Sequence, residues 1–109
     1  MWFSRFAGTP KPSVGIKDSP ALYADWSELK RERAKLDETI VGWADGLAPD
    51  WPQGDLVWFS GATQRELSMP KWITLVHFFN HQTHHRGQLH CMLTQAGAKP
   101  EDTDLVFMP

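Results

Sequence analysis

An apolar seam in the first half of the chain most constrains its fold. From residue 22 to residue 47, side chains spaced alternately four and three residues apart are apolar with a single exception: Leu22, Trp26, Leu29, Arg33, Leu36, Ile40, Trp43 and Leu47. This spacing places them on one face of a helix. Ser19-Pro20 is a typical helix start, and Gly46 and Pro49 are typical of a stop. The pattern predicts an amphipathic helix over residues 19–46.

A second long stretch, residues 69–97, contains no breaker between Pro70 and Gly97 and predicts a second helix. Between the two helices, residues 55–67 read as a short hairpin, with strands at 56–59 and 64–67 joined through Ser60-Gly61-Ala62. Residues 1–7 have helical spacing and end at Gly8. They are interpreted as the last turn of a helix whose earlier part is missing, followed by a loop over 8–18.

These elements predict an all-α fold, a single partial domain over residues 1–109. Two long helices and a short hairpin cannot enclose a core on both sides. We therefore expect a homodimer that completes a four-helix bundle across its interface.

Composition excludes several classes of protein. The net charge of −2 provides no basic surface for nucleic acid. One cysteine, Cys91, rules out an internal disulfide framework and fits a reducing compartment. No run approaches the ~20 apolar residues of a membrane span, and Met1–Phe6 does not resemble a signal peptide. We expect a cytoplasmic protein with no nucleic-acid or membrane partner.

Four of the five histidines fall between residues 77 and 85, inside the second predicted helix. His77, His81, His84 and Gln88 lie on one narrow stripe, with His85 at its edge. His81 and His85 are one turn apart, a spacing that aims two imidazoles at a common point, as in helical zinc sites. The pattern predicts a transition-metal site with His81 and His85 as ligands. Gln88, Thr83 or Asn80 are candidates to fix an imidazole tautomer.

The third ligand is left open by the spacing. His77 extends the series to i, i+4, i+8, although the helix drifts over two turns; His84, a partner subunit and solvent are the alternatives. A zinc protease is rejected because Gln82, rather than Glu, follows the first histidine and cannot act as a base. Cys91 points away from the pair and is not expected to be a nucleophile.

The segment His77-Phe78-Phe79-Asn80-His81-Gln82-Thr83-His84-His85-Arg86-Gly87-Gln88 resembles the DinB family of metal-binding proteins. The resemblance extends over essentially the whole chain and includes Arg5-Phe6-Ala7-Gly8. It implies an up-and-down four-helix bundle that holds a divalent metal, Ni or Zn, through His81 and His85. The family's third histidine, on its second helix, has no counterpart here, which implies an N-terminally truncated member with incomplete coordination.

Three functions follow from this resemblance. The first is a divalent-metal-binding protein of undefined activity, with no catalytic residue assigned. The second is a metal-dependent thiol S-transferase, in which the metal would lower the pKa of a small-molecule thiol. Arg86 would then orient an anionic substrate group, unless it forms an ordinary ion pair. The third is a non-catalytic dimeric remnant without metal.

Overall fold

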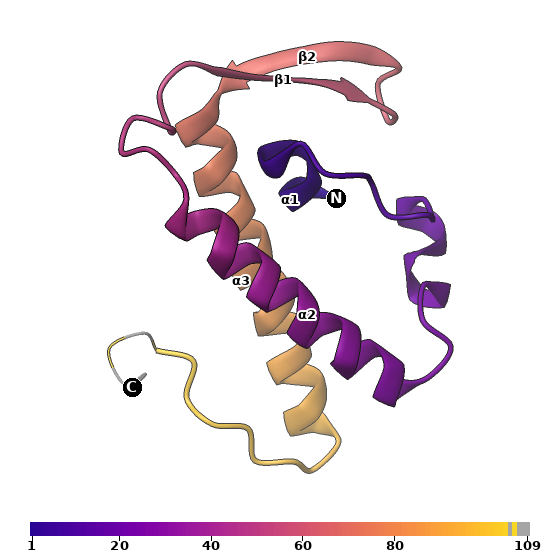
Figure 1. Ribbon diagram of the computed structural model, residues 1–109. Helices are drawn as coiled ribbons and strands as arrows, with labels where there is room; N and C mark the ends of the chain where they lie inside the picture. Colours follow the sequence, from indigo (N-terminus) through magenta and orange to yellow (C-terminus); the bar gives the residue numbers. More distant parts are fainter. Residues whose placement is uncertain (105, 107–109) are drawn as a thin grey trace. The chain divides into compact units, whose positions relative to one another are not determined.

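The computed structural model describes residues 1–104 and 106. The chain divides into two compact units, residues 1–72 and 73–109, and each is described by itself. The first contains α1 (Trp2–Ala7), the 3₁₀ helix η1 (Ile16–Ala21), α2 (Trp26–Asp45), and the strands β1 (Asp55–Ser60) and β2 (Arg65–Pro70) (Figure 1). Helix α3 (Lys71–Gln95) begins at the end of the first unit and makes up most of the second.

Helix α2 begins at Trp26 rather than near residue 19 because a reciprocal cap lies there. The Oδ1 of Asp25 accepts from the backbone N–H of Glu28 at 2.7 Å, and the Oε2 of Glu28 accepts from the N–H of Ala24 at 2.9 Å. This capping box satisfies two N–H groups at the helix start. Ser19 and Pro20 lie in η1 instead.

The prediction of an all-α fold is wrong. The strands β1 and β2 form an antiparallel two-stranded sheet, so the described chain is mixed α/β. The register pairs Asp55 with Pro70 at one end and Ser60 with Arg65 at the other. Burial alternates along β1, as it does in an extended strand with one face covered: Leu56 and Ser60 are buried, while Val57 and Phe59 are exposed.

The sheet extends beyond the predicted hairpin at the end of its second strand. The second helix was predicted to begin at residue 69, but Met69 and Pro70, like Ser68 before them, have partners in β1. Beyond the last pair, the N–H of Lys71 donates to the carbonyl of Gly54 at 2.9 Å. Pairing across the sheet therefore delays the start of the helix to Lys71.

An aromatic cluster forms the core of the first unit. Its members are Trp2, Phe3, Phe6, Trp43, Trp51 and Trp58. Phe6 is 8% exposed, and its ring centroid lies 5.8 Å from that of Trp51 and 5.9 Å from that of Trp2. Trp2 also meets Trp58 of β1 at 5.6 Å. The short helix α1 is thus held by packing on α2 and the sheet, since six residues are too few to be stable alone.

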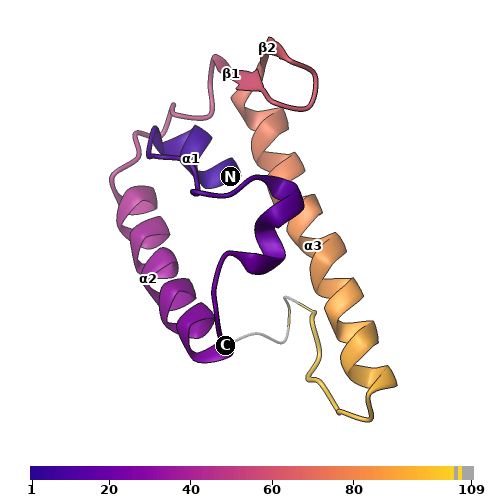
Figure 2. The same cartoon turned by 90° about the vertical axis from the view of Figure 1, so that its right-hand side faces the viewer.

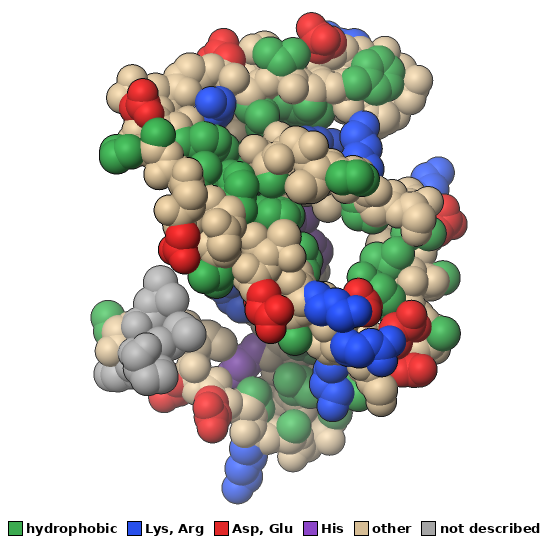
Figure 3. All heavy atoms as spheres, in the orientation of Figure 1, with side chains coloured by type: hydrophobic (Ala, Val, Ile, Leu, Met, Phe, Trp, Pro, Cys, Tyr) green, Lys and Arg blue, Asp and Glu red, His purple; other side chains and the backbone are tan. Residues whose placement is uncertain are grey.

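Helix α2 carries exposed charges of both signs. Arg33 pairs with Asp37 at 2.8 Å and Lys35 with Glu32 at 2.7 Å. Figure 3 shows acidic and basic side chains side by side on this part of the surface. These are exposed pairs at helical spacing, and each contributes about 0.3–0.5 kcal/mol.

Helix α3 is unbroken over 25 residues (Figure 2), a length of about 37 Å. Gly97, at φ +85°, ends it in a Schellman motif: the N–H of Ala98 donates to the carbonyl of Leu93 and that of Gly97 to the carbonyl of Thr94. Within the described part of the chain, no helix is both long and apolar enough to cross a membrane.

Candidate metal site

The histidines of α3 form a row along one exposed face of the helix. We call His77, His81, His84 and His85 the histidine row. The ring centroids of His81 and His85 are 4.5 Å apart, and those of His84 and His85 are 5.2 Å apart. All four residues are exposed. One turn of α-helix separates His81 from His85, so the helix alone brings these two together.

The two imidazoles of this pair meet through their Nε2 atoms, which are 3.1 Å apart. The Nδ1 of His85 lies 2.8 Å from Oε1 of Gln88. Because an amide oxygen only accepts, Nδ1 of His85 carries the proton and its Nε2 holds a lone pair. The hydrogen between the rings is then donated by Nε2 of His81. His85 is already in the tautomer that a metal requires, while His81 must carry its proton on Nδ1 to bind one.

The separation of the two nitrogens fits a shared metal ion. Zinc binds imidazole nitrogen at about 2.0–2.1 Å in tetrahedral geometry, which places two nitrogens of one site about 3.3 Å apart. The observed 3.1 Å is within a few tenths of an ångström of this value. The donor set suits Zn²⁺ and Ni²⁺, for which neutral imidazole is a good ligand.

The structure does not bring a third ligand to this pair. Among the residues that it describes, no group of three His, Cys, Asp or Glu side chains could hold one metal ion. His77 stacks on His81, with ring centroids 5.5 Å apart and ring planes 26° apart. Its role as a third ligand stays a prediction.

The surroundings of His81 lower its pKa. Desolvation, followed by the charges that His85, His77 and His84 would carry, lowers the pKa of His81 below its ordinary value. Imidazole binds metal only when neutral. The crowding of the histidine row therefore favours the metal-binding form of His81 at neutral pH.

The other polar groups near the row have partners of their own. The hydroxyl of Thr83 donates to the carbonyl of Phe79 at 3.0 Å and accepts from Arg86 at 3.1 Å. Of the three predicted tautomer-fixing residues, Gln88 is the one that contacts a histidine of the pair. Cys91 is exposed and reduced.

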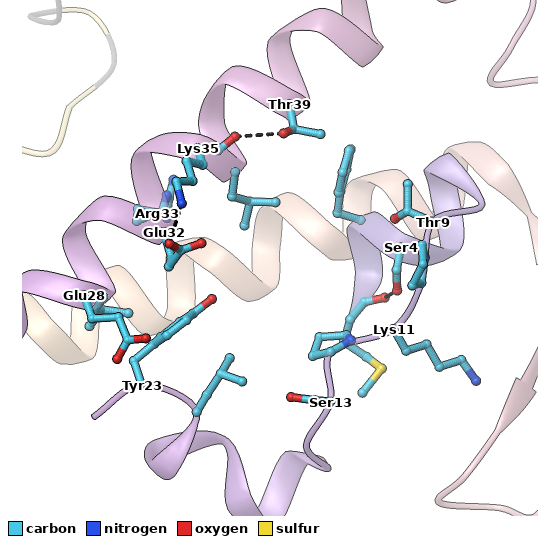
Figure 4. A pocket seen from close by; sticks show the side chains of 17 residues that line it. Ser4, Thr9, Lys11, Ser13, Tyr23, Glu28, Glu32, Arg33, Lys35 and Thr39 are labelled. Carbon is cyan, nitrogen blue, oxygen red and sulfur yellow. Dashed lines mark hydrogen bonds and ion pairs between the residues drawn. The ribbon is translucent and has the colours of Figure 1, made fainter. Parts of the chain in front are cut away.

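A separate pocket of about 730 Å³ lies in the first unit (Figure 4). Its walls come from α1, the loop after it, residues 22–23 and α2, and the ring of Tyr23 points into it. Leu29 and Leu36 supply apolar surface, and the pair of Glu32 with Lys35 lies among the polar groups. The sequence did not predict this pocket, because loop residues 9–13 contain no recognisable motif. No histidine or cysteine is among its lining residues, and its soft donor is the thioether of Met1.

Comparison with known proteins identifies a family. The model of the DinB family matches residues 1–109. No curated protein and no solved structure matches the chain.

Proposed function

The chain belongs to the DinB family, and from that premise we propose that it binds a divalent transition metal ion, Zn²⁺ or Ni²⁺, through His81 and His85. The observation that carries the proposal is the 3.1 Å separation of their Nε2 atoms. The DinB resemblance of the surrounding segment implies the same two ligands. Family membership alone leaves the activity of the chain undefined.

Each residue of the pair has its own part in binding. The hydrogen bond to Gln88 holds the ring of His85 and keeps its Nε2 available as a donor. His81 contributes its Nε2 once its proton lies on Nδ1. Its lowered pKa favours the neutral ring, which is the form that binds a metal. A metal held by two nitrogens keeps open positions and would act as a Lewis acid that lowers the pKa of a bound water or thiol.

Metal content of the full chain tests the proposal. Protein loaded with Zn²⁺ or Ni²⁺, freed of excess metal and analysed by plasma mass spectrometry is expected to retain metal. The double variant His81→Ala/His85→Ala is expected to lose it. His90→Ala is the matched control, because His90 lies on the same helix but about 180° from His81. Circular dichroism establishes that all three proteins are equally helical.

Two outcomes contradict the proposal. One is a wild-type chain that retains neither metal after loading. The other is a double variant that retains as much metal as the wild type, which would place the ion elsewhere.

A further inference from the structure

The His81–His85 pair supplies two of the four ligands of a tetrahedral metal ion. Two nitrogens converge, and in the part of the chain that the structure describes no further His, Cys, Asp or Glu joins them to form a three-ligand group. Closed zinc sites have four protein ligands. A second copy of the same pair would supply the missing two with the same chemistry and spacing.

The surface beside the pair is apolar and exposed. Leu89 and Met92 lie four and seven residues beyond His85, on the same side of α3. They are 56% and 64% exposed. A partner that covered the histidine pair would also bury these two side chains, and burial of apolar surface stabilises an interface.

The charge of α3 is compatible with a second copy of itself. The helix contains no Asp or Glu, and its charged residues other than histidine are Lys71 and Arg86. Arg86 follows His85 by one residue, about 100° round the helix, and donates to Thr83 rather than facing the pair. Two copies of the histidine face would therefore meet without carboxylates and without opposed arginines, whereas α2 carries exposed charges of both signs.

We propose that two copies of this chain share one divalent metal ion, each contributing His81 and His85. The inference rests on the proposed metal binding and adds the source of the remaining ligands. A two-fold axis through the metal makes the contact isologous, so that Leu89 and Met92 of each copy cover the opposite histidine face. Because the paired form offers the metal four nitrogen ligands and a single chain offers two, the metal binds the paired form more tightly and stabilises pairing by mass action.

Stoichiometry and mass, measured together, test this arrangement. Light scattering after gel filtration of the full chain with Zn²⁺ is expected to give twice the chain mass of 12.4 kDa. Plasma mass spectrometry of the same peak should give one metal per two chains, and chelation by EDTA should return the single-chain mass. One metal per chain at the single-chain mass would overturn the inference and leave metal binding intact. A pair that persists unchanged in EDTA would also overturn it.

A surface variant that keeps all ligands separates pairing from metal binding. Leu89→Lys/Met92→Lys places four ammonium groups in the proposed contact and is expected to raise the protein concentration needed for pairing at least tenfold. Val76→Lys/Phe79→Lys is the matched control, since these side chains are 52% and 57% exposed on the other side of α3. Equal effects of the two double variants would overturn the proposed interface. Loss of all metal from the wild-type chain would instead refute the proposed function itself.

Discussion

The aromatic cluster of the first unit and the histidine row of α3 consist of rings at similar spacings but in opposite environments. Ring centroids lie 5.1–6.5 Å apart in the aromatic cluster and 4.5–5.5 Å apart in the histidine row. The cluster encloses the buried Phe6, whereas every member of the row is exposed. Ring proximity therefore does not distinguish a core from a site.

What distinguishes them is the state of their polar atoms. In the aromatic cluster, phenylalanine has no polar atom, and the indole nitrogen of tryptophan is a hydrogen-bond donor only. In the histidine row, by contrast, Nε2 atoms face one another and two neutral imidazoles share one hydrogen. Desolvation, followed by the charges that the neighbouring histidines would carry, lowers the pKa of His81. Such an arrangement has nitrogen lone pairs left for a metal ion, and the aromatic cluster has none.

The largest effect is expected from removing the centre of the aromatic cluster. Phe6→Ala should lower the free energy of unfolding by about 3–5 kcal/mol, because it removes a buried ring and leaves a cavity. Urea unfolding followed by tryptophan fluorescence measures it. The control is Phe79→Ala, at a 57% exposed position of α3, where we expect a change within about 0.5 kcal/mol. Equal losses would show that the cluster is not the core.

The next effect concerns the hydrogen bond between His85 and Gln88. Gln88→Ala should weaken metal binding about 10–100-fold, because His85 loses the acceptor that fixes its tautomer. Calorimetric titration with Zn²⁺ measures the affinity. Gln82→Ala, about 100° round the helix from His81, serves as the control. An affinity unchanged by Gln88→Ala would remove Gln88 from the site.

A smaller effect is expected where the cluster meets a cation. The guanidinium of Arg5 lies 4.5 Å from the ring centre of Trp2 and 5.5 Å from that of Trp58. Arg5→Lys should cost about 0.5–1 kcal/mol, because an ammonium group cannot stack on both rings as a planar guanidinium does. Urea unfolding measures it against Arg65→Lys, a change at an exposed position. Equal stability of the two variants would contradict the stacking role.

The smallest effect is a shift in protonation within the row. In metal-free protein, His85→Gln should raise the pKa of His81, because it removes a neighbouring charge that lowers it. NMR titration of the imidazole protons measures the shift, and His90→Gln is the control. A pKa of His81 that is unchanged or lower would refute this account.

The sign of the pH dependence follows from the same shift. An unfolded histidine has a pKa of roughly 6.5, and the pKa of His81 in the folded chain is lower. Between these values the unfolded chain binds more protons, so the free energy of unfolding of metal-free protein should fall as pH falls through this window. In the His85→Gln variant this fall should be smaller.

The sequence predicted both long helices and the hairpin, and it also contained a motif that marks the true start of α2. Asp25 and Glu28 have the spacing of a capping box, which competes with Ser19-Pro20 as a helix start. Val57, Trp58 and Phe59 predicted the first strand of the hairpin. The predicted fold class was nevertheless wrong, because an all-α fold leaves out the sheet that the two strands form. The extension of β2 to Pro70 had no local signal, since it depends on pairing with Asp55 and Leu56.

The histidine pair is determined by the sequence alone, whereas the aromatic cluster is determined by the tertiary structure. His81, His85 and Gln88 lie within two turns of one helix, and helical periodicity is a local property, so their approach follows from the residues alone. Trp2 lies far along the chain from the other tryptophans of the cluster. Trp43, Trp51 and Trp58 belong to α2, the loop after it and β1, so no single periodic element brings them together. Only the tertiary structure decides that they meet, because the chain must close loops and pack α1, α2 and β1 before those contacts form.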